Sequence, residues 1–152
     1  MPIDYKLFKI GKNSKIWNPE LVNIYGEVVI GDNCNIGTFV EISGKVVIGD
    51  NVRIGAFCFI PGGVVIEDDC FIAPSCVFTN DLYPPSHRRE WRKTLVKKGT
   101  MIGAGSIILP GVVIGEKAIV GAGTCVYQDV PDGQRVVGSP MRRMILPVDI
   151  CK

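Results

Sequence analysis

One polar segment, Thr79–Leu95, gathers most of the side chains that could do chemistry. It contains His87, the only histidine of the chain, followed closely by Arg88, Arg89 and Arg92. An imidazole can exchange a proton near neutral pH, and a guanidinium group can donate two hydrogen bonds to a phosphate or diphosphate. Because long polar loops in compact proteins often carry function, the segment predicts a functional loop. The alternative is an ordinary surface loop whose charges are solvated.

The six cysteines predict buried free thiols, with disulfides or a metal site as the alternatives. None of them forms a C-x-x-C pair, and four lie inside apolar stretches, at Cys34, Cys58, Cys70 and Cys76. Unpaired buried cysteines are typical of a reducing compartment, so the prediction is a cytoplasmic protein. A metal site needs a cluster of ligands, which neither these cysteines nor a single histidine supplies. We therefore expect no metal.

The elements that must position these side chains follow a period of six residues. Every sixth residue is apolar from Ile24 to Phe78, and the same register returns from Val96 to Val126. This period fits no helix; it fits short strands joined by tight turns, with three hexads closing one triangular coil. These key residues are Ile24, Ile30, Ile36, Ile42, Ile48, Ile54, Ile60, Ile66, Ile72, Phe78, Val96, Ile102, Ile108, Ile114, Val120 and Val126.

The other hexad slots support an all-β hexapeptide β-helix. The chain has 19 Ile and 19 Val against 6 Leu and 5 Ala, which favours strands over helices. Glycine often follows the key residue, and we expect it to supply turn conformations there. A small or branched residue lies four positions after the key residue, and we expect its side chain to point inward. Residues 24–131 make eighteen hexads, or about six coils. The prediction is one domain, 1–152, with a β-helix over 16–136, an extruded loop at about 79–95 and a tail over 137–152.

The surface predicts contacts with other copies of the chain. A net charge of +2 gives no reason to expect nucleic acid, and no apolar run is long enough to span a membrane. Val29, Val47, Val65 and Val113 occupy outward positions next to key residues, where they form flat apolar faces. Exposed apolar faces of this kind usually mark an interface.

Two strings, VFTND and TLVKKGTMIGAG, separated by the polar loop, resemble the left-handed β-helix acyltransferases. More narrowly, they are similar to the sugar 3-N-acetyltransferases that modify UDP- or dTDP-linked 3-amino sugars for surface glycans. The resemblance runs from about Ile16 to Met141. It implies a left-handed parallel β-helix, a homotrimer, acetyl-CoA as donor, and active sites between neighbouring subunits.

The resemblance also suggests which residues meet the acceptor. The asparagine of the FTN motif, Asn80, corresponds to a residue near the acceptor amine, although it could simply start a turn. Asp81 could hold the sugar or the loop. In related acetyltransferases that act on xenobiotics and galactosides, a loop histidine is the general base, a role that His87 could play. Arg88, Arg89 and Arg92 would meet the diphosphate.

The donor site carries over less completely. Ala104 and Ala122, each after a glycine, match positions where related enzymes hold the pantetheine arm against the coil, although small residues there also suit any turn. A cation that often meets the CoA phosphates is replaced here by Gln128. Four residues could supply the missing charge: Lys97, Lys98, Arg142 and Arg143.

These observations predict an acetyl-CoA-dependent N-acetyltransferase acting on a nucleotide-linked 3-amino sugar. One alternative is an O-acetyltransferase that uses His87 as general base, and another is a β-helix scaffold without catalysis. A zinc carbonic anhydrase of the same fold is excluded. Its zinc needs three histidine ligands and an open fourth position, whereas this chain has one histidine.

Overall fold

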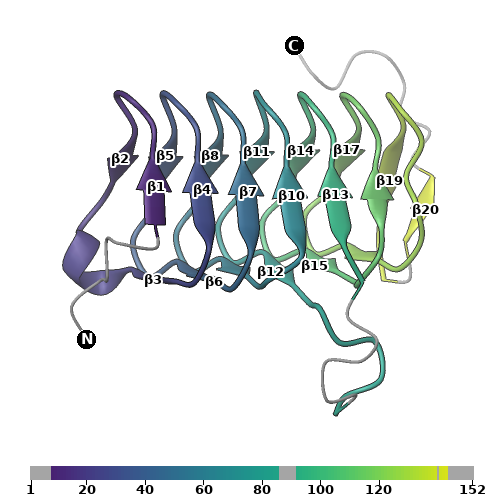
Figure 1. Cartoon of the computed structure of the whole chain (residues 1–152). Coiled ribbons are helices and arrows are strands. Elements are labelled where there is room, and N and C mark those ends of the chain that lie inside the picture. The colour runs from purple at the N-terminus through teal and green to yellow at the C-terminus, as the bar shows by residue number, and fades with distance from the viewer. Residues whose placement is uncertain (1–7, 86–91, 140, 144–152) are drawn as a thin grey trace.

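The computed structural model describes residues 8–85, 92–139 and 141–143, and they form a three-sided parallel β-solenoid of about seven turns (Figure 1). The described part contains no α-helix; its one helical turn is the 3-10 helix η1, Pro19–Leu21. The all-β β-helix predicted from the hexads is therefore confirmed.

Three sheets run the length of the solenoid, and from β1 to β18 successive strands of the chain pass from face A to face B to face C. The turns between them form three edges, which we call the AB, BC and CA corners. Face A contains β1 (Phe8–Ile10), β4 (Val28–Ile30), β7 (Val46–Ile48), β10 (Val64–Ile66), β13 (Thr94–Val96) and β16 (Val113–Ile114); face B contains β2 (Lys15–Ile16), β5 (Asn35–Ile36), β8 (Arg53–Ile54), β11 (Phe71–Ile72), β14 (Met101–Ile102), β17 (Ile119–Val120), β19 (Arg135–Val137) and β20 (Arg142–Arg143); face C contains β3 (Asn23–Tyr25), β6 (Glu41–Ser43), β9 (Phe59–Ile60), β12 (Val77–Phe78), β15 (Ile107–Ile108) and β18 (Cys125–Val126).

The core consists of the predicted residues. Every key residue from Ile24 to Val126 is at most 2% exposed, and the small slot four positions later is buried as well. Polar members of that slot donate to turn carbonyls of the next coil: Thr100 Oγ1 to Gly115 O at 2.8 Å and Cys34 Sγ to Gly49 O at 3.1 Å. The slot therefore accepts a small residue with a hydrogen-bond donor as readily as valine.

The solenoid extends further toward both ends of the chain than predicted. β1 and the turn that leads into β2 add nearly half a coil before residue 16, with Phe8 beside Val28. At the other end, β20 pairs antiparallel with β19, so part of the predicted 137–152 tail belongs to face B. The antiparallel strand covers the edge that face B would otherwise expose.

The loop also differs from its expected bounds. The coil resumes at Thr94 in β13, so the loop ends before Leu95. Phe78 and Val96 are eighteen positions apart, yet they lie on consecutive faces C and A, a step that takes six positions along most of the coil. The loop thus inserts twelve residues, the equivalent of two hexads. Figure 1 shows it leaving the CA corner, away from the three sheets.

The role predicted for glycine is wrong in its detail. Glycines directly after the key residue, such as Gly37, do not have positive φ; a Cβ there would lie 2.6 Å from Ala56 N of the next coil. These positions bring neighbouring turns close together. Positive φ occurs three positions after the key, for example at Asn33, Gly105 and Lys117.

The burial of the thiols makes a testable prediction. Cys34, Cys58, Cys70 and Cys76 are buried and unpaired, and burial raises the pKa of Cys34, as well as that of Cys70 to about 11. Since the thiolate is the reactive form, we expect at most two of the six thiols to react with a disulfide reagent in the native protein. All six should react in denaturant. A native count above two would contradict the core assignment.

Candidate active site

The first root of the loop presents Asn80 at the CA corner. Immediately after β12, both the amide and Oγ1 of Thr79 donate to Ile108 O, at 2.9 and 3.2 Å, which fixes the chain on the next coil. Asn80 follows, half-buried. Asp81 Oδ1 accepts a hydrogen bond from Tyr83 N at 3.1 Å. This turn within the loop supports the interpretation that Asp81 organises the loop.

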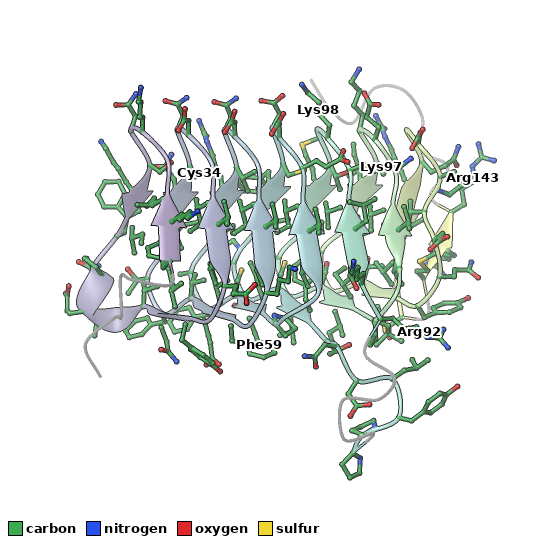
Figure 2. All side chains as sticks on the ribbon, viewed as in Figure 1. Cys34, Phe59, Arg92, Lys97, Lys98 and Arg143 are labelled. Carbon is green, nitrogen blue, oxygen red and sulfur yellow. The ribbon has the colours of Figure 1, made fainter. Side chains whose placement is uncertain are left out.

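The second root is fixed by Thr94. Its amide donates to Gly63 O at 3.0 Å, and its buried Oγ1 accepts from Gly111 N at 3.2 Å. Arg92, labelled in Figure 2, lies against Gly111, because a Cβ on that glycine would come within 2.9 Å of Arg92 Cδ. Arg92 is exposed at the same corner as Asn80. Of the predicted acceptor residues, the structure thus gathers Asn80, Asp81 and Arg92 at the roots of the loop.

Ala104 and Ala122 lie at the BC corner, on neighbouring coils. Gly123 N donates to Ala104 O at 2.8 Å, and Gly105 N donates to Pro74 O at 3.0 Å, so the turns stack in a row. Space is open around Gly105 and Gly123, where an added Cβ would meet nothing within 4 Å. The corner therefore offers an exposed surface without large side chains, on which an extended acyl carrier could lie. We call it the small-residue track: Pro74, Ser75, Ala104, Gly105, Ala122 and Gly123.

Face C separates the two candidate regions. On the consecutive strands β9, β12, β15 and β18, its outward-facing side chains are apolar and half-buried or exposed: Phe59, Val77, Ile107 and Cys125. From Ala104, the chain crosses face C in about six residues before it reaches the turn beside Asn80, which corresponds to roughly 15–20 Å. Within one chain, the donor and acceptor candidates therefore occupy opposite edges of an apolar face.

Lys97 and Lys98 lie at the AB corner, away from the small-residue track. Lys97 Nζ is 3.4 Å from Asp132 Oδ1, and Lys98 Nζ is 3.4 Å from Asp69 Oδ2. The pKa of Asp132 is lowered, mainly because its carboxylate accepts a hydrogen bond from the backbone N–H of Glu116, and to a smaller extent because of Lys97. The structure does not bring these lysines together with Ala104 and Ala122.

Arg142 and Arg143, by contrast, share a pocket with Gln128. The pocket has a volume of about 390 Å³ and lies at the C-terminal end of the solenoid, where Asp129 and Met141 also line it. Both arginines are exposed on β20, and Figure 2 shows Arg143 pointing away from the coil. The two arginines therefore line the same pocket as Gln128, the position where the expected cation is replaced by glutamine.

Comparisons with known proteins agree with this architecture. The family model for the bacterial transferase hexapeptide (six repeats) matches residues 45–80 and 93–128, and a hexapeptide repeat of succinyl-transferase matches 27–44. The gap between the first two ranges coincides with the loop. The dTDP-3-amino-3,6-dideoxy-alpha-D-galactopyranose 3-N-acetyltransferase of Aneurinibacillus thermoaerophilus is 52% identical over 136 residues, 88% of this chain and 70% of that protein. The chain belongs to the hexapeptide-repeat acyltransferases.

Other known proteins match this acyltransferase over different extents. The putative acetyltransferase YvoF of Bacillus subtilis is 54% identical over 56 residues, which cover 37% of this chain and 33% of that protein. AntD, an N-acyltransferase from Bacillus cereus in complex with dTDP and 3-hydroxybutyryl-CoA, superimposes with a TM-score of 0.80 at 31% identity, covering 90% and 81% of the two chains. The acetyltransferase domain of PglB from Neisseria gonorrhoeae, 17% identical over 86% of this chain and 57% of that one with a TM-score of 0.73, shares the fold.

Three predicted residues of this acyltransferase, His87, Arg88 and Arg89, lie outside the described residues. Among the residues that are described, no three metal-ligating side chains gather. None of the helical turns in the described ranges has the length and apolarity of a membrane span.

Sequence reasoning missed two features of the site. One is the buried Thr94, which fixes the second root of the loop; its place two positions before the key Val96 was the available signal. The other is the apolar outer surface of face C. The available signal was the residue directly before each key residue, because its side chain points outward.

Proposed function

We propose that this acyltransferase moves an acetyl group from acetyl-CoA to the 3-amino group of a dTDP-linked 3-amino-3,6-dideoxy sugar used for a surface glycan. The relative with 52% identity, which carries this activity in its name, supports the proposal, as does the loop rooted at Asn80. AntD, also named as an N-acyltransferase, supports dTDP over UDP as the nucleotide.

Each part of the site has a task in this reaction. The small-residue track holds the pantetheine arm along the BC corner, and Asn80 orients the neutral amine with its side-chain carbonyl. The nitrogen lone pair forms the C–N bond at the thioester carbon, and the C–S bond then breaks with its electron pair passing to sulfur. The nitrogen proton goes to the departing thiolate. A neutral amine is already a good nucleophile, so the main requirement is position.

The active unit that we propose is a homotrimer. Val29 and Val47 are exposed on face A, Val65 and Val113 are half-buried, and Leu95 completes the apolar row between them. A cyclic trimer joins two different surfaces of neighbouring subunits, so one subunit can present its loop to another subunit's track. In such a trimer, Asn80 of one subunit can lie beside the track of the next subunit, although face C separates Asn80 from Ala104 within a single chain.

Two further assignments complete the proposal. Arg142 and Arg143 bind the phosphates of acetyl-CoA at the end of the solenoid, in place of the cation absent at Gln128. The enzyme works in the cytoplasm, where thiols stay reduced, in keeping with its buried unpaired cysteines.

The arginine assignment predicts an effect on donor binding alone. The double variant Arg142→Ala/Arg143→Ala should raise KM for acetyl-CoA about three- to tenfold, because two charge-assisted contacts at an exposed site are lost. Its kcat should stay within about twofold. Arg53→Ala, an exposed arginine on face B, is the matched control. An unchanged KM, measured by initial rates at low ionic strength, would place the phosphates elsewhere.

The experiment that tests the function is a thiol-release assay over a panel of nucleotide-linked sugars. The panel contains dTDP and UDP sugars with an amine at C3, an amine at C4, or a hydroxyl at C3. We expect turnover to be highest with the dTDP-linked 3-amino sugar. Turnover of the hydroxyl compound alone would replace the proposal with an O-acetyltransferase, and turnover of none would refute both.

A further inference from the structure

The BC corner changes character along its length. On the C-terminal coils it is the small-residue track, whereas on the N-terminal coils the same slot holds Phe39 and Phe57. Hydrogen bonds show that the row is continuous: Phe57 N donates to Thr38 O at 3.1 Å, and Ser75 N donates to Ala56 O at 2.9 Å. One corner of the solenoid thus has an aromatic half followed by a smooth half.

The two phenylalanines are held in an unfavourable backbone conformation. Phe39 and Phe57 have φ of 58° and 60°, whereas every other described residue with positive φ is Gly, Asn, Asp, Ser or Lys. Bulky side chains rarely adopt this region, so asparagine or glycine would suit the turn better. The turn imposes positive φ at this slot on other coils as well, so the choice of phenylalanine is what the fold leaves unexplained, and unfavourable choices of this kind are common at functional sites.

Burial in the core does not explain these residues. Phe39 is 50% exposed and Phe57 is 59% exposed. Their rings stack on each other, with centroids 4.9 Å apart and planes inclined by 19°. The corner therefore presents a pair of nearly parallel aromatic rings to the outside, in line with the small-residue track.

We propose that the Phe39–Phe57 pair is the surface on which the pyrimidine base of the nucleotide-linked acceptor stacks; this rests on the proposed function. Aromatic side chains bind bases through their flat faces. If the acyl carrier occupies the coils of Ala104 and Ala122, the acceptor has to approach from the N-terminal side of the row. Phe57 lies two coils before Gly105, roughly 10 Å at the spacing of parallel strands, a distance that a nucleoside diphosphate can bridge.

The proposal also fits a site shared between subunits. Base and acyl carrier then lie on the BC corner of one subunit, and the loop carrying Asn80 comes from its neighbour. The competing occupant of the aromatic pair is a second copy of the chain, packed against the rings in the trimer. The two occupants predict different behaviour when the rings are removed.

The test replaces Phe57 and, separately, Phe39 with asparagine, which tolerates positive φ. Phe71→Asn is the matched control, because Phe71 is an exposed phenylalanine on face B without positive φ. For each variant we would measure Kd for dTDP and for CoA by calorimetry, Tm, and mass by light scattering. Turnover would be measured with the dTDP-linked amino sugar and with the amino-sugar 1-phosphate, which lacks the base.

We expect Phe57→Asn to raise Kd for dTDP about tenfold or more. Kd for CoA, the mass and turnover of the base-free acceptor should stay as in the wild type, and the Tm should not fall, because asparagine tolerates positive φ better than phenylalanine. Phe71→Asn should change Kd for dTDP less than twofold. An unchanged Kd for dTDP, or equal losses with the base-free acceptor, would overturn the base-stacking assignment. Dissociation into monomers would assign the rings to a subunit contact instead. Wild-type protein that acetylates no nucleotide-linked amino sugar would refute the proposed function itself, independently of the variants.

Discussion

Asn80→Ala is expected to lower kcat/KM for the amino-sugar acceptor by about ten- to a hundredfold, and His87→Ala to lower it by less. An orienting hydrogen bond made in the transition state contributes roughly 1.5–3 kcal/mol, which converts to that range. A neutral amine needs little help from a base, so loss of His87 removes no essential proton acceptor. A hydroxyl acceptor would reverse the order, since a lost general base costs ~10²–10⁴-fold.

The measurement is steady-state kinetics of both variants on the best acceptor of the panel. Circular dichroism and Tm would show that each variant is folded. Asn35→Ala is the control, because Asn35 is a half-buried asparagine on face B without positive φ. If His87→Ala is nearly inactive while Asn80→Ala resembles the wild type, the amine mechanism is wrong and the O-acetyltransferase replaces it.

Two strongly impaired variants should regain about a quarter of wild-type activity when they are produced together. Asn80→Ala lacks the acceptor contact, and Ala122→Trp places a large ring on the small-residue track. If each site combines the loop of one subunit with the track of the next, half of the loops are intact and half of the facing tracks are intact in a random mixture. About one quarter of the sites then contain two intact halves.

The matched control is Glu116→Trp, which adds the same ring at the exposed AB corner and should leave activity unchanged. Ala122→Trp should keep the wild-type Tm, because Ala122 is exposed. Activity equal to the average of the two separate variants would show that the loop and the track of one chain form the site by themselves. A monomeric mass in light scattering would contradict the shared site as well.

The repeat in the sequence was sufficient to predict the solenoid and its core. Each key isoleucine packs against its counterparts on the neighbouring coils, so the spacing of six carries both strand positions and burial. The spacing could not predict how far the chain advances across the loop. Eighteen residues preserve the register whether they form a full coil or one step with an insertion, because both are multiples of six.

The candidate site was predicted less completely, for a related reason. The motif residues were assigned one at a time, but their grouping depends on the corner that each occupies. Lys97 and Ala104 are close in sequence, yet face B separates their corners. The hexad pattern does not predict the exposed phenylalanines, because they occupy the positive-φ slot three positions after the key residue, to which the repeat assigns no inward side chain.

The way the loop leaves and re-enters the solenoid bears on how such enzymes diversify. Because Thr79 and Thr94 attach its two ends to adjacent coils at one corner, the intervening residues can lengthen, shorten or be exchanged without shifting any strand. The track on the opposite edge of face C remains untouched by such changes. With the proposed assignment of the loop to the sugar and the track to the acyl donor, preference for the sugar can evolve by replacement of a single short segment, while recognition of the donor is inherited unchanged.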